Sequence, residues 1–577
     1  MIFKPQFIDG ANAPFLEYPR PQFKRDSYLN LNGEWDYAIT NANVKPDFFE
    51  GKIIVPFSPE SKNSKVNRQL KPNEFLHYKR TFTLPDGFNK GRVLLNIGAI
   101  DQISEIYING IFLKRFEGGY YSFSVDITTA LYSGENELYI LVKDDASSDI
   151  FGRGKQKYKR GGIWYTATSG IWQSVWLESV PNDYLKSFKL YPNYDDKTLK
   201  ITFDAPKTVK TIVYDGDEVV AEKISSNNEV VLDVSKCNPW SPENPELYKL
   251  VFETGEDVVE SYFGLRKFSL VEKNGKKFIA VNNKPTFNNG LLDQGYWLDG
   301  LYTPSDNYSM YSELQNIKNL GFNMLRKHIK TEPYLWYYYC DILGILVWQD
   351  MINGGGEYPF FRLALCPFFN LNLDDTNYKK MKRSEKSKEQ YFKEADLMIE
   401  QLFNTVSLCL WTPFNECWGQ FDAENVYYEL SKKDETRLFD HASGWQDKGV
   451  SDLNSKHIYF RKLKLKNDYK RALAVTEFGG YSCGLKGHIF TNKKFGYKFF
   501  NSTDKLEKAY EKLYLSEVIP AIKNQGLSAT VYTQLADVED EINGLYTYDR
   551  VLKISTETIK KVNDAVYDAF NKSLENL

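Results

Sequence analysis

The stretch Val406-Ser-Leu-Cys-Leu-Trp411 is a run of apolar and small residues that leads, through Thr-Pro-Phe, to the pair Asn415-Glu416. A second run, Leu473-Ala-Val-Thr476, leads in the same way to Glu477. Each pattern is typical of a short buried strand that ends in a carboxylate. Because barrel enzymes carry their catalytic side chains at the carboxyl ends of parallel strands, the sequence predicts that Glu416 and Glu477 face one another across a substrate bond.

Around these two runs, strand-like and helix-like segments alternate over residues 271–577. This alternation predicts a parallel sheet, and roughly 300 residues suit a (β/α)8 TIM barrel. A doubly wound sheet is the alternative, but no glycine-rich fingerprint opens a helix. A long aromatic segment at about 350–385 is expected to form a loop at the face that carries the strand ends. The expected strands are 287–292, 323–328, 346–349, 406–411, 473–477 and 529–534, and the expected helices are 307–320, 332–343, 387–403, 425–433, 506–523 and 555–574.

The first 270 residues have a different pattern, with short strands separated by Gly, Asn and Asp. In residues 1–180 the strands are expected at 92–97, 105–110 and 136–142, which predicts a jelly roll or sandwich. Residues 181–270 have the length of an immunoglobulin-like β-sandwich. A Pro-rich turn, Pro239–Pro245, precedes one of its strands. The predicted organisation is therefore 1–180, 181–270 and a catalytic barrel at 271–577.

Composition excludes several classes of partner. Lys and Arg number 73 and Asp and Glu number 76, so the net charge of −3 indicates no nucleic-acid partner. No apolar run of membrane-spanning length occurs, and Met1–Pro5 lacks the core of a signal peptide, which predicts a cytoplasmic protein. The six cysteines show no ligand-like spacing, so neither a metal site nor a disulfide framework is expected. The aromatic content of 15% fits large β cores; sugar recognition is the alternative.

The two carboxylates suggest a chemistry. One could protonate a leaving oxygen while Asn415 donates to a neighbouring hydroxyl. Each motif also has a structural explanation: Glu416 could stabilise a helix N-terminus, and Glu477 with Gly479-Gly480 could belong to an ordinary β-to-α loop. Together they fit a retaining glycosidase, in which the carboxyl groups lie about 5–5.5 Å apart and one is ionised while the other is protonated.

Several motifs occur in a fixed order along the chain. They are Arg20-Pro-Gln22, Leu29–Trp35, Ser169–Trp172, Val175–Glu178, Phe263–Arg266, Arg326-Lys-His328, Trp411 with Asn415-Glu416, Asp440–Trp445 and Thr476–Gly479. Through these motifs the sequence resembles glycoside hydrolase family 2 over nearly its whole length. The resemblance implies a sugar-binding jelly roll, an immunoglobulin-like sandwich and a TIM barrel, with β-galactosidase-, β-glucuronidase- or β-mannosidase-like activity.

The resemblance assigns roles to four residues. Glu416 matches the acid/base at the end of strand four, and Glu477 matches the nucleophile at the end of strand seven. Asn415 matches the residue that contacts the sugar 2-hydroxyl. Arg326 matches the strand-two arginine that supports the nucleophile, where a cation lowers the pKa of a carboxylate.

Further candidates for sugar contacts are less specific, because each could equally pack in the core. They are His328, His457, Asp350 at the tip of a strand, and Trp445. Tyr481 and Tyr532 lie near strands seven and eight, and structural packing is the favoured role for both. A seventh candidate, Trp164, stands where galactosidases and glucuronidases of the family carry an Asp.

Two departures bear on the substrate. Family members that cleave glucuronides carry an Asn-x-Lys element after strand eight, whereas Asn543-Gly-Leu545 has no Lys, which disfavours a glucuronide. Trp164 in place of an Asp cannot accept hydrogen bonds from hydroxyls, which weakens the case for a galactoside.

The sequence thus predicts a retaining exo-β-glycosidase acting on an oligosaccharide or glycoside, with a β-galactoside-like sugar as the first guess. The alternatives are a β-glucuronidase, a β-mannosidase or a non-catalytic carbohydrate-binding protein. A barrel lyase or aldolase would need a Schiff-base lysine, and Lys327 is the one strand-tip candidate. No cofactor, metal, nucleic acid or membrane partner is expected, and a homo-oligomer is possible.

Overall fold

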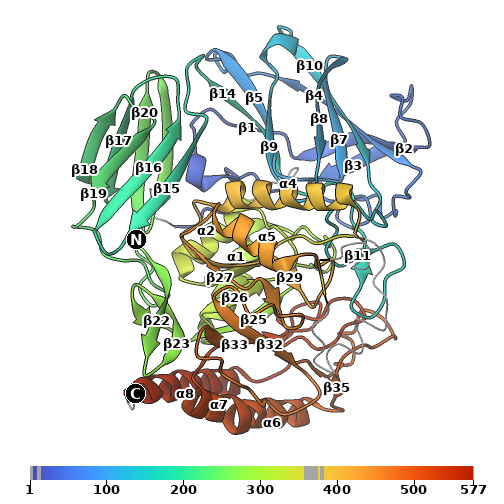
Figure 1. The fold of residues 1–577 in the computed structure, drawn as a ribbon. Coiled ribbons are helices and arrows are strands. Elements are labelled where there is room, and N and C mark those ends of the chain that lie inside the picture. Colours follow the sequence, from blue (N-terminus) through green and yellow to red (C-terminus); the bar gives the residue numbers. More distant parts are fainter. Residues whose placement is uncertain (1–3, 9–13, 356–373, 377–382, 576–577) are drawn as a thin grey trace.

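The computed structural model describes residues 4–8, 14–355, 374–376 and 383–575. Two β-rich regions lie against one end of a mixed α/β region (Figure 1). The expected loop at 350–385 falls mostly outside the described residues. Among the helices that are described, none has the length and apolar character needed to cross a membrane.

The first region is a jelly roll made of two antiparallel sheets packed face to face. The larger has the order β3-β2-β4-β10-β7-β8, and the smaller has the order β1-β14-β5-β9. Strand β7 alternates partly exposed and buried residues, as period-two patterning requires, whereas the central strand β10 is buried from Leu138 to Val142. The strands are β1 (Leu29–Asn30), β2 (Gly33–Thr40), β3 (Gly51–Val55), β4 (Phe75–Thr83), β5 (Arg92–Ile97), β6 (Ile100–Asp101), β7 (Ile103–Ile108), β8 (Ile111–Glu117), β9 (Phe123–Asp126), β10 (Glu135–Lys143), β11 (Gln156–Lys157), β12 (Tyr165–Thr166), β13 (Gly170–Ile171) and β14 (Val175–Val180).

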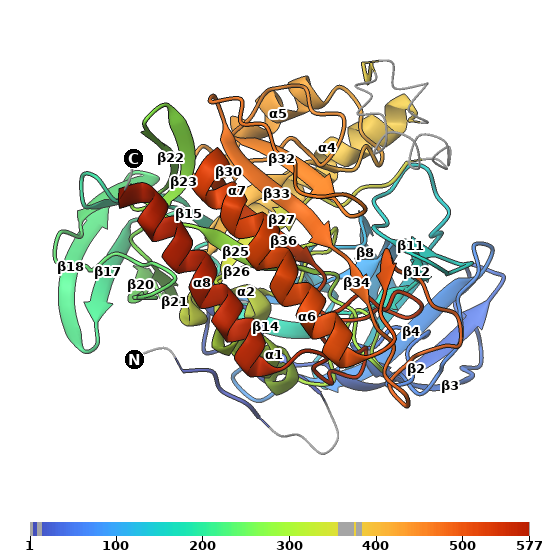
Figure 2. The same ribbon diagram turned by 90° about the horizontal axis from the view of Figure 1, so that it is seen from below.

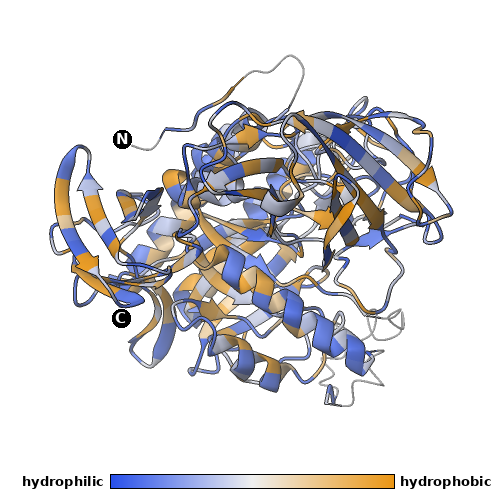
Figure 3. Cartoon of the chain, turned by 90° about the horizontal axis from the view of Figure 1, so that it is seen from above, coloured by the Kyte–Doolittle hydropathy of each residue, from blue (hydrophilic) through white to orange (hydrophobic). Residues whose placement is uncertain are grey.

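The second region is an immunoglobulin-like sandwich with its own apolar core. A three-stranded sheet, β15-β16-β19, faces a four-stranded sheet, β18-β17-β20-β21. In both β-rich regions the strands alternate between hydrophilic and hydrophobic colours (Figure 3). A small antiparallel sheet of β22, β23 and β24 then leads into the barrel. The strands are β15 (Ser187–Asn193), β16 (Thr198–Asp204), β17 (Val209–Asp215), β18 (Glu218–Ser225), β19 (Glu229–Asp233), β20 (Tyr248–Thr254), β21 (Asp257–Phe263), β22 (Phe268–Lys273), β23 (Lys276–Val281) and β24 (Lys284–Pro285).

The third region is the TIM barrel, an eight-stranded parallel sheet of order β30-β28-β27-β26-β25-β36-β33-β32. The ring closes between β30 and β32, where the Asp452 amide donates to the Phe439 carbonyl at 3.1 Å. All residues of β27, β28, β33 and β36 are buried, as strands covered on both faces must be. The strands are β25 (Asn288–Asp293), β26 (Met324–Lys327), β27 (Leu346–Asp350), β28 (Leu408–Thr412), β30 (Leu438–Phe439), β32 (Leu453–Ile458), β33 (Ala472–Gly479) and β36 (Leu527–Thr533), with β29 (Phe414–Asn415), β31 (Ala442–Ser443), β34 (Tyr481–Ser482) and β35 (Lys498–Phe499) beyond the ring.

Several barrel helices begin at polar caps, whereas α2 begins after Pro333 with no side-chain cap. Asp306 accepts a hydrogen bond from the Ser309 amide at the start of α1, and Ser502 does the same for the Lys505 amide at α6. Helices α6 and α7 follow one another along the outside of the ring, and α8 lies alongside both (Figure 2). The predicted helix 506–523 is two α-helices joined by a π-helical turn at Tyr514–Val518. The helices are α1 (Asn307–Asn319), α2 (Tyr334–Leu343), α4 (Glu385–Leu402), α5 (Ala423–Ser431), α6 (Thr503–Leu513), α7 (Ile519–Gln525) and α8 (Thr556–Glu575).

Helix α4 lies between the barrel and the jelly roll (Figure 1). Its Gln401 accepts a hydrogen bond from the Ser122 amide at 2.9 Å, and its Glu394 accepts one from the Gly152 amide at 3.3 Å. The jelly roll is therefore fixed against the barrel close to the face where the strands end.

Candidate active site

The two predicted carboxylates meet at the carboxyl end of the barrel. Glu477 lies within β33, and Glu416 follows β29, the short extension of strand β28. One oxygen of each and one ring nitrogen of His457 all lie within 4.8 Å of one another. That separation agrees with the spacing of a retaining pair, about 5–5.5 Å between carboxyl groups.

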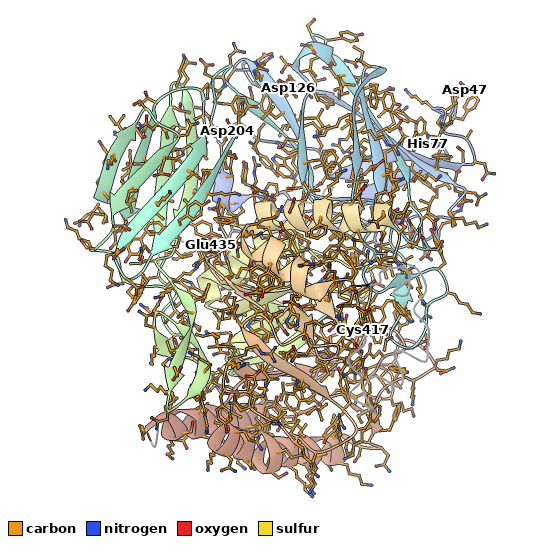
Figure 4. The ribbon with its side chains drawn as sticks, in the orientation of Figure 1. Asp47, His77, Asp126, Asp204, Cys417 and Glu435 are labelled. Atoms are coloured by element: carbon orange, nitrogen blue, oxygen red, sulfur yellow. The ribbon has the colours of Figure 1, made fainter. Side chains whose placement is uncertain are left out.

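The backbone at Glu416 is strained. Its φ is +49° and that of Cys417 is +61°, a left-handed region that L-residues rarely adopt. The surrounding structure holds it there, because the Glu416 amide donates to the carbonyl of Ser443 at 3.0 Å, and such strain concentrates at functional sites. Cys417 lies on the same side of the molecule as β11 (Figure 4).

The environment of Glu416 suits a general acid. Burial raises the pKa of its carboxyl to about 7; the nearby charges of Lys155 and Arg326 oppose this rise and that of Glu541 adds to it. Its oxygen Oε1 lies 2.7 Å from Nδ1 of His457. A carboxyl with such a pKa is partly protonated near neutral pH, as a proton donor to a leaving group must be.

Glu477 is held by two donors. Nη1 of Arg326 lies 3.2 Å from Oε1, and the hydroxyl of Tyr459 donates to Oε2. Burial raises the pKa of the Glu477 carboxyl and Glu416 adds to this, whereas His457 and Arg326 lower it. The fixed cation and the hydroxyl donor favour the ionised form that a nucleophile needs.

Arg326 organises the base of the site. It is fully buried and makes a bidentate ion pair with Asp350, with both N–O distances 3.0 Å. Its Nη2 also donates to Oδ1 of Asn415 at 2.8 Å. This bond orients the Asn415 amide so that its NH2 group, which has no protein acceptor among the described residues, is available to a ligand.

Asp350 contacts both Arg326 and His328. One of its oxygens accepts from both Arg326 and, at 2.6 Å, Nδ1 of His328. Since both Asp350 oxygens are engaged and the side chain is buried, the geometry favours a supporting role over the predicted sugar contact. Burial and the charge of Lys155 lower the pKa of His328 to about 3, so this ring is neutral.

His457 lies between the two carboxylates. Its Nδ1 is 2.7 Å from Glu416 and 3.7 Å from Glu477. Nη1 of Arg326 lies 3.4 Å from Nε2, which makes Nε2 the acceptor and leaves the proton on Nδ1. Burial lowers the pKa of His457 to about 4. The neutral ring therefore donates to Glu416.

Aromatic rings lie around the two carboxylates and His457. Trp445 is half-buried with its ring 5.9 Å from that of His457. Trp164, from the jelly roll, stacks on Trp418 at 4.9 Å, two residues after Glu416. Tyr532 is buried in the core, and Tyr481 packs on Phe500, so both have the packing role favoured from the sequence.

The structure adds site residues that the sequence did not suggest. Tyr459 follows β32 and stacks on Tyr497 at 3.9 Å between ring centroids. Glu541 is buried and accepts hydrogen bonds from Tyr165 and Asn543. Little in the sequence indicated them, because Tyr459 follows the polar strand β32, and Tyr497 and Glu541 lie in loops.

Among the described residues, a divalent cation could fit between Glu416, His457 and Glu477, because one ligand atom of each lies within 4.8 Å of the others. The carboxylates and imidazole are suitable ligands for zinc. Binding would break the His457–Glu416 and Tyr459–Glu477 hydrogen bonds. An acid–base role for Glu416 and a nucleophile role for Glu477 use both of these hydrogen bonds.

Family models match three consecutive parts of the chain. Residues 33–161 match the glycosyl hydrolase 2 galactose-binding domain-like model, and residues 184–266 match glycosyl hydrolases family 2. Residues 273–569 match the glycosyl hydrolases family 2 TIM barrel domain.

Individual proteins are similar at low identity. The chain is 24% identical over 441 residues to a putative beta-glucuronidase of Formosa agariphila, covering 71% of this chain and 48% of that protein. It is 23% identical over 462 residues to a beta-galactosidase of Streptococcus thermophilus, covering 71% of this chain and 42% of that one. The chain thus spans about half the length of these curated relatives. The beta-D-glucuronidase structure of Dictyoglomus thermophilum superposes with a TM-score of 0.74 at 17% identity, over 95% of this chain and 98% of that one. The likeness to that structure concerns the fold.

Proposed function

This chain belongs to glycosyl hydrolase family 2, and from that premise we propose that it is a retaining, exo-acting β-glycosidase. The observation that carries the proposal is the approach of Glu416 and Glu477 within 4.8 Å at the mouth of the barrel. An inverting enzyme would need a gap of about 6.5–9.5 Å to admit water between its carboxyl groups.

The proposed reaction has two displacements. Glu477 attacks the anomeric carbon while Glu416 protonates the departing oxygen, which yields a covalent glycosyl-enzyme. Glu416, now ionised, then takes a proton from water as the water attacks the same carbon, and Glu477 leaves. The amide NH2 group of Asn415 is placed to donate to the sugar hydroxyl next to the reacting carbon, and Tyr459 and Arg326 hold Glu477 in position.

The sugar has two leading candidates. The relatives named beta-galactosidase support the β-galactoside favoured from the sequence. The relative and the structural neighbour named beta-glucuronidase support a β-glucuronide at least as well, despite the missing lysine after Asn543.

A single experiment tests the mechanism. Hydrolysis of 4-nitrophenyl β-glycosides, including the galactoside, glucuronide, glucoside and mannoside, is followed by NMR from the first turnover. The expected first product is the β-anomer, which then mutarotates. The α-anomer as first product would refute the retaining mechanism, and inertness toward every substrate would favour a binding protein.

A further inference from the structure

A segment of the jelly roll enters the barrel mouth. The amides of Arg153 and Gly154 donate to the carbonyl of Asn353, after strand β27, at 3.0 and 3.1 Å. Gly154 has a φ of +57°, and a Cβ there would lie 2.8 Å from the carbonyl of Ile329. The close approach brings the next residue, Lys155, over the ends of the barrel strands.

Lys155 lies among the catalytic groups. It is 8% exposed, and its Nζ is 5.4 Å from the ring centroid of Trp418 and 5.7 Å from that of Tyr165. Its charge acts on Glu416 and Glu477. A cation at this position is therefore close enough to act on both carboxylates of the proposed function.

The ammonium group of Lys155 lacks an anionic partner. Among the described residues no carboxylate lies within ion-pair distance of its Nζ, and no oxygen accepts a hydrogen bond from it. Other buried lysines are paired: Lys327 with Asp293 at 2.5 Å and Lys553 with Asp537 at 2.6 Å. An ammonium removed from water without a partner is costly, and the two rings offset only part of that cost.

The acidic residues nearby are already engaged. Glu541 accepts from Tyr165 on one oxygen and from Asn543 on the other. Glu416 is bonded to His457. Among the described residues no carboxylate is thus left to pair with Lys155, and an anionic group of a ligand can take that place.

We propose that Lys155 binds a carboxylate of the sugar, so that the substrate class is a β-linked uronide. This inference rests on the proposed function and specifies its substrate. A site with a buried charge discriminates strongly against an analogue that cannot pair with it, because that analogue leaves the charge unsatisfied. Lys155 is thus a specificity-determining residue contributed by the jelly roll.

The test compares two matched pairs of 4-nitrophenyl substrates, the β-glucuronide with the β-glucoside and the β-galacturonide with the β-galactoside. Members of a pair differ in a carboxylate against a hydroxymethyl group. For at least one pair the wild type is expected to favour the uronide in kcat/KM. Lys155→Met should lower kcat/KM for that uronide by about 10- to 100-fold more than for its neutral partner, because only the uronide loses a charge-assisted bond. Lys155→Arg keeps the charge, and Lys159→Met, at an exposed position of the same segment, is the control.

The outcomes separate the two hypotheses. Preference for the neutral sugars overturns the inference and leaves the proposed function intact, as does an equal loss on all four substrates in Lys155→Met. If no substrate is hydrolysed, the proposed function fails, and calorimetric binding of the same four compounds to the Glu477→Gln protein decides the inference. Uronide binding that disappears on adding Lys155→Met supports it, and its absence, or binding unaffected by that change, refutes it. Thermal melting confirms that each variant is folded.

Discussion

Arg326 donates a hydrogen bond to Glu477 from Nη1 at 3.2 Å, from a position with no solvent exposure. The same guanidinium holds the Asn415 amide through Nη2. One buried side chain from strand two thus positions a group from strand seven and a group from strand four.

Replacing Glu477 with Gln should abolish turnover and leave the fold intact. Gln has nearly the same shape, and its amide oxygen can still accept from Arg326 while its NH2 group donates to the Tyr459 hydroxyl, but it cannot attack the anomeric carbon. We expect kcat to fall by about 10⁴-fold or more, the scale seen when a nucleophile is removed. Steady-state kinetics with a thermal melt provide the measurement. A variant that melts normally and retains appreciable activity would refute the assignment of Glu477 as the nucleophile.

Replacing Glu416 with Gln should give a different kinetic pattern. Loss of the acid matters less for a substrate whose leaving group needs no proton, so the first displacement of a dinitrophenyl glycoside should remain fast. The second displacement loses its base, and overall kcat should fall by about 10²- to 10⁴-fold. Added azide, which attacks without a base, should restore turnover in this variant and not in Glu477→Gln. Equal behaviour of the two variants would argue against distinct roles.

Activity should decline as the pH rises through about 7. Burial raises the pKa of Glu416 to about that value, and the acid works only when protonated. A pH profile of kcat/KM on an alkyl glycoside, whose leaving group needs the proton, should therefore show an alkaline limb near 7. Glu416→Gln should lack it. A profile that stays flat to pH 9 would mean that another group supplies the proton.

The same pKa makes a prediction about stability. Between the ordinary carboxyl value and about 7, the folded state binds a proton at Glu416 that the unfolded chain has released. Stability from this group is therefore present at low pH and is lost as the pH rises through that window. Glu416→Gln should raise the free energy of unfolding by about 1–3 kcal/mol at pH 8 and by much less at pH 5. Urea titrations at both pH values would reveal the difference, and a uniform effect would contradict it.

Tyr459→Phe should slow the reaction without altering the ring stack on Tyr497. It removes the hydroxyl that donates to Glu477. We expect kcat/KM to fall by about 10- to 100-fold, as for the loss of a hydrogen bond to a charged group. Tyr481→Phe, on a half-buried ring that packs on Phe500, is the matched control. Comparable losses in both variants would assign the effect to packing.

The sequence predicted the barrel strands that end in the two carboxylates, but not the strands and loops that carry most of the residues around them. Glu416 and Glu477 were found because buried apolar runs end at them, and a buried parallel strand is a strong local signal. Strands β30 and β32 were missed: β30 has two residues, and β32, Leu453–Ile458, carries Asn454, Ser455 and Lys456 in place of an apolar run. Loops stand on both sides of β32 where a (β/α)8 barrel ordinarily has helices, so the alternation that revealed the other strands is absent there.

Residues that come from another part of the chain were the hardest to foresee. Tyr459 was missed with its strand. Lys155 and Trp418 are in contact because the jelly roll packs on the barrel, and the sequence pattern of neither region indicates that contact. Asp350 was found at a strand tip, but its two partners, Arg326 and His328, are visible only in three dimensions.

The seating of Gly154 against Ile329 and Asn353 has a consequence for engineering. A barrel expressed alone would lack one wall and one cation of its own binding cleft. Transplanting residues 150–168 between relatives, with the barrel left untouched, is a route to exchanging their preferences for charged and uncharged sugars.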